Sequence, residues 1–214
     1  MNGTDKMLSV IGPSYFHPIA WLVEKLLTMP SGTPSELKAH DYENGYAAGI
    51  CVLSVVSFES WAMRIRYLNA KHAAASQKTA VNFLSTLYPT LPDVDELWEV
   101  VVLRDLLVHN HLWEIDFAWD DSYALSVSAA TKSTMSGDAK YLLHVDAASR
   151  VTRRLRLHVV PTSVDRTDAR LALQSIWKTL LFLESQDRSQ CFVSHYPLQF
   201  RGKKAYFQEV VESL

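Results

Sequence analysis

The sequence has few of the residues that mark secreted, zinc-binding or repetitive proteins. Cys51 and Cys191 are the only cysteines among 214 residues, so by themselves they neither build a disulfide framework nor complete a tetrahedral zinc site. Glycine occurs only seven times, and we find no internal repeat or low-complexity run. The N-terminus lacks a basic stretch followed by an apolar run, so we expect no signal peptide. A reducing, cytoplasmic location is the simplest expectation.

The chain also lacks a strong net charge and a long uncharged run. The formal net charge is -2 at pH 7, so the surface as a whole does not attract nucleic acid, and any such binding must come from a local patch. The uncharged run Gly45 to Phe58 is shorter than the roughly 20 apolar residues of a membrane span, which favours a buried helix and no membrane segment. Hydrophobic residues make up 48% of the chain, enough for a sizeable core.

Apolar residues recur at helical spacing over much of the chain. The expected helices are Phe16 to Met29, Asp41 to Ala73, Gln77 to Leu87, Asp93 to about Leu112, Ala169 to Ser185 and Ala205 to Leu214. Asp93 is the expected N-cap of its helix, with Glu96 three residues later in a capping-box arrangement. Asp165 and Asp168 suit the N-terminus of a later helix, since acidic groups stabilise that end.

The period changes between Phe117 and His158. Expected strands are Ser122 to Ala129, Lys140 to Asp146 and Arg150 to Val160, the last because apolar and basic residues alternate along it. The sequence therefore predicts a mainly α protein, a helical bundle with a small antiparallel β-sheet insertion at about residues 117–160. We see no linker that would divide residues 1–214, so we expect a single domain.

The segment with the highest concentration of chemically functional side chains is Arg104-Asp105-Leu106-Leu107-Val108-His109-Asn110-His111. An arginine binds phosphate strongly, and a histidine moves a proton near neutral pH. Asp105 lies near the middle of an apolar helix face, where a carboxylate needs a partner, and His109 is one turn away. The spacing thus predicts an Asp105–His109 contact, and it leaves open whether Arg104 acts with His109 or with His111.

This segment resembles the signature of the HEPN superfamily, an arginine followed after four to six residues by a histidine on a late helix of a bundle. Arg104 and His109 match the four-residue spacing, with the polar Asp105 after the arginine, and His111 matches the six-residue spacing. The resemblance covers about residues 15–115 and 165–187. It implies a metal-independent endoribonuclease that acts as a homodimer, with two copies of the motif facing one another.

The chain departs from one branch of that family. In HEPN toxins paired with a nucleotidyltransferase antitoxin, a tyrosine follows the histidine by two residues, and here that position is His111. Some HEPN families carry an acid on the first long helix, and Glu59 is the candidate; its alternative role is a salt bridge with an arginine one turn away. A toxin or antiviral defence role, with an antitoxin or regulatory protein as partner, fits the family.

The resemblance implies RNA cleavage by the substrate's own 2′-hydroxyl, with no metal or other cofactor. Arg104 would stabilise charge on phosphorus, His109 or His111 would transfer a proton, and Asp105 would orient His109. The alternative is a non-catalytic HEPN module that binds RNA, a nucleotide or a partner protein. A metal-dependent hydrolase ranks last, because His109 and His111 point to different sides of one helix.

A second basic group is the candidate RNA-binding surface. Four arginines lie on or beside one expected strand: Arg150, Arg153, Arg154 and Arg156. Their guanidinium groups can contact phosphates, which supply much of the affinity for nucleic acid. The alternative is a solvated strand face whose charges protect a sheet edge.

Overall fold

The computed structural model describes residues 9–30, 39, 41–109, 113–117, 125–130 and 139–214. The predicted fold class is confirmed, since the chain is mainly helical with small antiparallel sheets. The helices are α1 (Phe16–Thr28), α2 (Asp41–Leu68), α3 (Ala80–Leu87), α4 (Val94–Val108), α6 (Ala139–His144), α7 (Arg166–Gln186) and α8 (Phe207–Glu212), with short 3-10 turns at Gly12–Tyr15, Ala73–Ser76 and Pro161–Ser163. The described strands are β1 (Trp113–Phe117), β2 (Leu125–Ala130), β3 (Val145–Asp146), β4 (Val151–Thr152), β5 (Pro197–Phe200) and β6 (Lys203–Tyr206), and each pairs with its neighbour in sequence.

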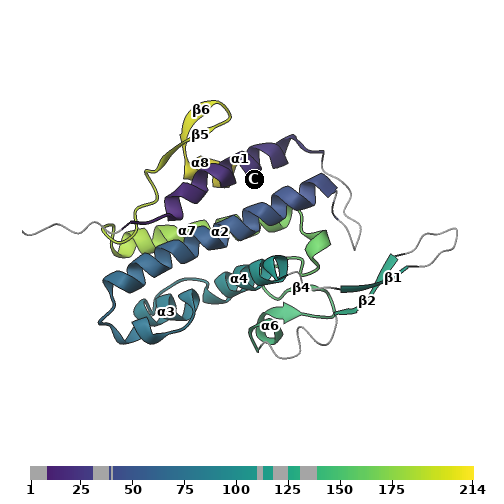
Figure 1. The fold of residues 1–214 in the computed structure, drawn as a ribbon, viewed down its shortest axis with the longest axis horizontal. Helices are drawn as coiled ribbons and strands as arrows, with labels where there is room; N and C mark the ends of the chain where they lie inside the picture. The colour runs from purple at the N-terminus through teal and green to yellow at the C-terminus, as the bar shows by residue number, and fades with distance from the viewer. Residues whose placement is uncertain (1–8, 31–38, 40, 110–112, 118–124, 131–138) are drawn as a thin grey trace, which may run out of the picture.

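Helix α2 is the centre of the bundle. It packs against α1, α4 and α7, and Figure 1 shows it crossing the middle of the molecule between them. Phe58, Trp61 and Ile65 are fully buried on it, which provides the large apolar contact area that stabilises the core. By length and composition alone, Tyr42–Leu68 is apolar enough to cross a membrane. Half of an apolar 18-residue stretch within it is buried inside the protein. The helix begins at the predicted Asp41 but ends at Leu68, before the predicted end at Ala73.

The two predicted helix starts have different outcomes. Asp165 caps α7 as expected: its side chain accepts the Thr167 and Asp168 backbone N–H groups, and Asp168 closes the capping box. Asp93 does occupy the N-cap position of α4, but its side chain makes no cap hydrogen bond. The predicted capping box is wrong there, because the Asp93 carboxylate pairs instead with Lys178 of α7.

The predicted strand from Lys140 to Asp146 is mostly a helix. Helix α6 covers Ala139–His144, and only β3 (Val145–Asp146) is extended. Tyr141 and Val145 are four residues apart and both lie in a second, smaller apolar cluster with Val102, Leu106 and Val159. A strand that buried Tyr141 and Val145 would also bury Leu143, which is 68% exposed, so the packing on α4 favours a helix here.

The predicted strand from Arg150 to Val160 keeps its alternation but not its hydrogen-bond ladder. Leu157 and Val159 are buried, whereas Arg154 and Arg156 are exposed, as expected. Yet β4 covers only Val151–Thr152, and the chain turns back so that the Leu157 carbonyl accepts the Thr152 N–H. Arg150 and Arg156 have φ angles of 56° and 61°, a left-handed conformation that ends a regular strand.

Two further boundaries differ from the prediction. Helix α4 ends at Val108 rather than near Leu112, and β1 begins at Trp113, so extended chain begins before Phe117. At the C-terminus, the expected helix from Ala205 begins at Phe207, after a β5–β6 hairpin that the helical pattern did not predict. Arg201 and Gly202 form its turn, both with positive φ, which a two-residue hairpin turn of type I′ requires.

Candidate functional site

Arg104 lies in the wall of a pocket between α2, α3, α4 and α6. The pocket has a volume of about 330 Å³. Its described lining residues are Glu59, Met63, Arg66, Lys78, Thr79, Ala80, Val81, Trp98, Val101, Arg104, Asp105 and Lys140. We call this the Arg104 pocket. Helix α4 carries Arg104 one turn after the fully buried Val100, so the arginine lies at the edge of the helix surface that packs into the bundle.

Two carboxylates hold the Arg104 guanidinium in place. Arg104 Nη2 donates to Glu59 Oε1 of α2 at 2.6 Å. Arg104 Nε lies 3.1 Å from Asp105 Oδ1, an ion pair whose geometry is not that of a hydrogen bond, because the buried Nε has no hydrogen-bond partner among the described residues. The Arg104 side chain is only 19% exposed, so the guanidinium is fixed before any ligand arrives. Of the two roles open for Glu59, a salt bridge forms, but with Arg104 on another helix rather than with an arginine one turn away.

The Asp105 carboxylate joins α4 to the Lys140 side chain of α6. Lys140 Nζ of α6 donates to Asp105 Oδ2, while Asp105 Oδ1 faces Arg104. The backbone also joins Asp105 to His109, since the His109 N–H donates to the Asp105 carbonyl at 3.0 Å. That Asp105 orients the His109 imidazole therefore stays a prediction.

Of the two candidate histidines, only His109 lies within the described residues. His109 is the C-cap of α4 and is exposed, one turn beyond Asp105, and it is not among the described residues that line the Arg104 pocket. His111 lies outside the described residues. The choice between them as partner of Arg104 remains a prediction.

The Arg104 pocket has an excess of positive charge. Its described lining holds four cationic side chains, those of Arg66, Lys78, Arg104 and Lys140, against the carboxylates of Glu59 and Asp105. Arg66 is anchored by a 2.9 Å hydrogen bond to the Thr79 carbonyl, and its guanidinium lies over the Phe83 ring. Cations held in a partly enclosed site attract an anionic ligand more strongly than cations in open water.

The predicted basic cluster is not one surface. Arg154 pairs with Asp95 of α4, and Arg156 lies 3.8 Å from Asp146. The Arg153 guanidinium donates to the Leu142 carbonyl at 3.4 Å. Arg150 is half-buried and lines a different pocket. The structure thus separates Arg150 from the other three arginines, and whether any of them binds RNA remains a prediction.

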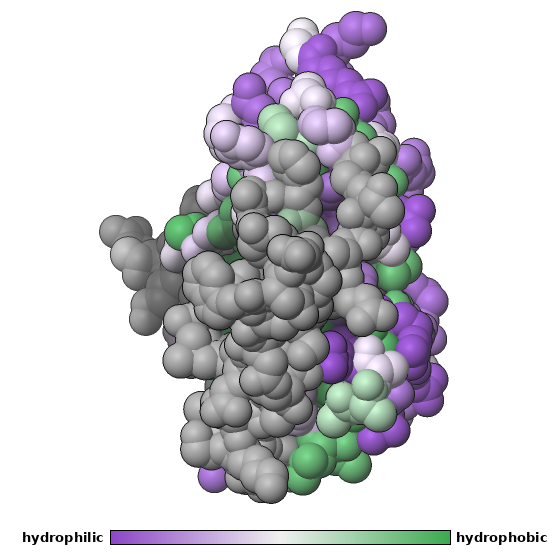
Figure 2. Space-filling model, turned by 90° about the vertical axis from the view of Figure 1, so that its right-hand side faces the viewer, coloured by the Kyte–Doolittle hydropathy of each residue, from purple (hydrophilic) through white to green (hydrophobic). Residues whose placement is uncertain are grey.

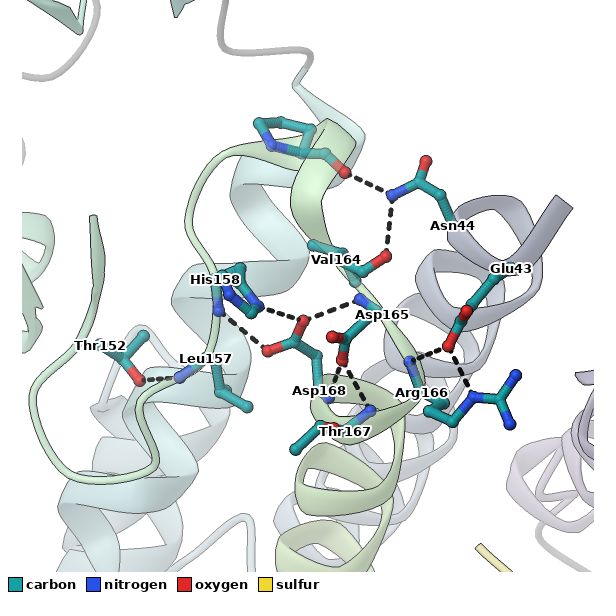
Figure 3. Close-up of polar contacts among 11 residues, drawn as sticks. Glu43, Asn44, Thr152, Leu157, His158, Val164, Asp165, Arg166, Thr167 and Asp168 are labelled. Carbon is teal, nitrogen blue, oxygen red and sulfur yellow. Dashed lines mark hydrogen bonds and ion pairs between the residues drawn. The ribbon is translucent and has the colours of Figure 1, made fainter. Parts of the chain in front are cut away.

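That different pocket includes a histidine–aspartate pair that the sequence analysis missed. Its volume is about 340 Å³, and the described lining residues are Ala148, Ser149, Arg150, Val151, His158, Val160 and Ser163. We call it the Arg150 pocket. His158 Nδ1 lies 2.9 Å from Oδ2 of the buried Asp168, as Figure 3 shows. The hydrogen bond to Asp168 raises the pKa of His158 above its ordinary value, against the opposing effect of partial burial.

Several contacts fix Asp168 behind the imidazole. The Asp168 carboxylate accepts the backbone N–H groups of His158, at 2.9 Å, and of Asp165, at 2.8 Å. Asn44 of α2 donates to the carbonyls of Pro161 and Val164 and so holds the turn that leads into α7 (Figure 3). The only sequence signal was the pair of acids at the start of α7, because the ten-residue separation from His158 matches no local pattern.

His158, Asp165 and Asp168 are close enough to form a metal-type cluster. One ligand atom from each lies within 4.8 Å of the others, the one such group found among the described residues. However, Asp165 Oδ1 and each of the two Asp168 carboxylate oxygens already accept a hydrogen bond from a backbone N–H group. In addition, His158 Nδ1 faces Asp168. A cation would have to displace these bonds, so we interpret the cluster as a polar tie between α7 and the segment before it.

A buried acid on α4 also stabilises the fold by accepting backbone N–H groups. Glu99 is 1% exposed, and its two carboxylate oxygens accept the backbone N–H groups of Arg154 and Leu155 at 2.7 and 2.8 Å. These bonds satisfy the carboxylate, which is costly to bury alone. Glu99 therefore fixes the turn between Thr152 and Leu157 on the bundle, and no helical pattern in the sequence distinguished it.

Large apolar side chains are exposed on elements that surround the Arg104 pocket. Met63 and Tyr67 of α2 are 55% and 66% exposed, and Leu142 and Leu143 of α6 are 59% and 68% exposed. Figure 2 shows a hydrophobic patch at the lower end of the face it presents, at the height of α6 in Figure 1. Exposed apolar groups near a site are typical of a contact surface.

Comparison with known proteins does not assign the chain to a family. No family model matches it, and neither a curated protein nor a solved structure matches it.

Proposed function

We propose that the chain is a metal-independent endoribonuclease whose active site is the Arg104 pocket together with the end of α4. The observation that carries the proposal is the Arg104 guanidinium, fixed by Glu59 and Asp105 in a pocket that also presents Arg66, Lys78 and Lys140. A fixed guanidinium with further cations beside it suits a phosphate whose charge increases during a reaction, because preorganised groups need not rearrange.

The chemistry follows from the groups available. The 2′-hydroxyl of RNA attacks the adjacent phosphorus while the bond to the 5′-oxygen breaks, which leaves a 2′,3′-cyclic phosphate and a 5′-hydroxyl. Arg104 stabilises the added negative charge on the phosphate oxygens. A histidine accepts the 2′-hydroxyl proton or protonates the departing 5′-oxygen, and His109 is the first candidate, with His111 second. Neither step needs a metal.

A homodimer built around α4 would complete this site. His109 is exposed at the end of α4 rather than in the wall of the Arg104 pocket, so a second copy can bring its histidine and its cations into one cleft. The exposed side chains of Met63, Leu142 and Leu143 supply apolar area for such a contact. The proposal also includes a cytoplasmic location and RNA as the substrate. It further includes a role as a toxin or antiviral effector, with an antitoxin or regulatory protein as partner.

The test is cleavage of mixed RNA in EDTA by the wild type and by Arg104→Ala, His109→Ala and His111→Ala, each confirmed folded by circular dichroism. Loss of a general acid or base costs on the order of 10² to 10⁴ in rate. The matched control is Arg188→Ala, because the Arg188 side chain is 63% exposed, lies beside Glu184 and belongs to neither the Arg104 pocket nor the candidate RNA-binding surface. Equal cleavage by all variants would remove the proposed site, and cleavage that requires a divalent ion would point to a metal enzyme.

The second candidate function is a non-catalytic module that binds RNA or a nucleotide in the Arg104 pocket. It is favoured by one observation, that the described lining supplies cations and the half-buried Trp98 but not the His109 ring. Such a module binds RNA without cutting it, and Arg104→Ala weakens that binding. Fluorescence anisotropy with labelled RNA separates the two functions, since only the ribonuclease shortens its ligand.

A further inference from the structure

The Arg150 pocket has the composition of an anion site. Its described lining contains one guanidinium, one imidazole and the hydroxyl-bearing Ser149 and Ser163, and it contains no carboxylate. Among the residues that line it, charged groups are therefore of one sign. The pocket lies where the segment around β4 meets the turn before α7, away from the residues that line the Arg104 pocket.

The imidazole in this pocket is held in a fixed orientation. His158 Nδ1 is engaged by Asp168, which is 2% exposed and itself fixed by two backbone N–H bonds, whereas the His158 side chain is 37% exposed. Of the two ring nitrogens, Nε2 is thus the one left to a ligand. Asp168 and Asp165 of α7 are the acidic groups that favour the protonated ring, and Arg150 is the cation that faces the same pocket.

Arg150 is also placed by a backbone that is unusual for its residue type. Its φ angle is 56°, and its carbonyl accepts the Val159 N–H at 3.0 Å, so the chain reversal brings Arg150 next to the strand that carries His158. This reversal is what joins the two cationic residues in one cavity of about 340 Å³, a size that admits a phosphate group and a small substituent.

We propose that the Arg150 pocket is a second ligand site, which binds a phosphate group through Arg150 and the Nε2 side of His158. The Arg150 guanidinium and the His158 imidazolium donate to the phosphate oxygens. The ligand is a free phosphate or a terminal phosphate monoester of a nucleic acid, and the two share the same doubly charged group. The site does not depend on the ribonuclease proposal.

The experiment measures binding by isothermal titration calorimetry with three probes. These are inorganic phosphate, a short 5′-phosphorylated DNA and the same DNA with a 5′-hydroxyl, because DNA lacks the 2′-hydroxyl and is not cut by the chemistry proposed above. Binding of inorganic phosphate supports the site. Binding of the 5′-phosphorylated DNA alone supports it and identifies a nucleic-acid end as the source.

The decisive variants are Arg150→Asn and His158→Gln. Asparagine tolerates positive φ, so Arg150→Asn removes the charge without adding backbone strain. We expect each variant to weaken phosphate binding about tenfold or more, the usual value of one charged hydrogen bond in affinity. Arg188→Gln, which changes an arginine that is 63% exposed and lines neither pocket, is the matched control and should bind as the wild type does.

Three results would overturn the proposal: no probe with a phosphate group binds, Arg150→Asn binds as well as the wild type, or Arg188→Gln weakens binding as much as Arg150→Asn. The last result would mean that the affinity comes from general positive charge. A thermal melt of each variant confirms that it is folded, so that weaker binding of Arg150→Asn reports on the pocket itself.

Discussion

The Arg104 pocket and the Arg150 pocket both place a cationic group beside a carboxylate, but they hold it in opposite ways. In the Arg104 pocket the acids are partly exposed, at 35% for Glu59 and 19% for Asp105, and they lie on rigid helices. At the Arg150 pocket the acid is Asp168, which lies behind the lining residue His158, is almost fully buried and accepts backbone N–H groups. The comparison teaches that the first carboxylates hold the Arg104 guanidinium in place, whereas Asp168 also stabilises the fold.

The largest effect on stability should come from Asp168→Ala. The change removes the His158 partner and the acceptor of two backbone N–H groups at the start of α7. Breaking a buried pair of this kind costs about 3–5 kcal/mol in the free energy of unfolding. Urea denaturation followed by circular dichroism measures it, and Asp105→Ala is the matched comparison, expected to cost less than half as much. If Asp105→Ala costs as much, the two pockets do not differ in the way described.

A smaller loss is expected for Glu99→Gln. The glutamine amide keeps one oxygen acceptor but turns an N–H donor toward the Arg154 or Leu155 N–H group. Leaving one such buried group unsatisfied costs about 1–3 kcal/mol. The control is Asp95→Asn, because the Asp95–Arg154 pair is more than half exposed and such pairs are worth about 0–1 kcal/mol. Equal midpoints in urea for the two variants would contradict the anchoring role of Glu99.

The third prediction concerns pH. The folded-state pKa of His158 is raised, so its contribution to stability is fully present below the unfolded value of about 6.5 and is lost as the pH rises through the folded value. The wild type should therefore lose stability relative to His158→Gln as the pH rises above neutral. Taking the difference between the two proteins removes the effect of His144, whose pKa is lowered by burial and acts in the opposite sense. A difference that stays constant between pH 5 and pH 9 would show that the Asp168 bond does not favour the charged ring.

The smallest effect is expected at Lys178→Gln. Lys178 pairs with Asp93, but its side chain is 60% exposed and Asp93 is 37% exposed, so solvent screens the pair. We expect the free energy of unfolding to change by less than about 1 kcal/mol, with no change in RNA cleavage or phosphate binding. A loss as large as that of Glu99→Gln would mean that Asp93, which makes no cap bond, still controls the start of α4.

The sequence predicted what depends on local spacing. The helices α1, α2, α3, α4 and α7 follow apolar periodicity, and Asp165 with Asp168 marked the start of α7. It did not predict features made by contacts distant in sequence, such as the α6 helix, which forms because Tyr141 and Val145 pack on Val102 and Leu106. The candidate sites show the same difference between local spacing and distant contacts.

Within the candidate sites, Arg104 and Asp105 were found because they lie together on one helix. Glu59 was named, but its partner could not be, because the 2.6 Å contact joins residues 45 positions apart. The contact between His158 and Asp168 was missed because no local pattern joins residues ten positions apart, and the positive φ of Arg150 depends on a chain reversal that alternation alone does not indicate.

The most direct test of the central claim is RNA cleavage in EDTA by Arg104→Lys measured beside Arg150→Asn. Lysine keeps the charge but loses the planar fork that Glu59 and Asp105 hold in position. The account predicts that Arg104→Lys cleaves RNA about 10² to 10³ times more slowly than the wild type. It predicts that Arg150→Asn cleaves at the rate of the wild type. Full activity in Arg104→Lys, or its loss in Arg150→Asn alone, would contradict the assignment of the ribonuclease site to the Arg104 pocket.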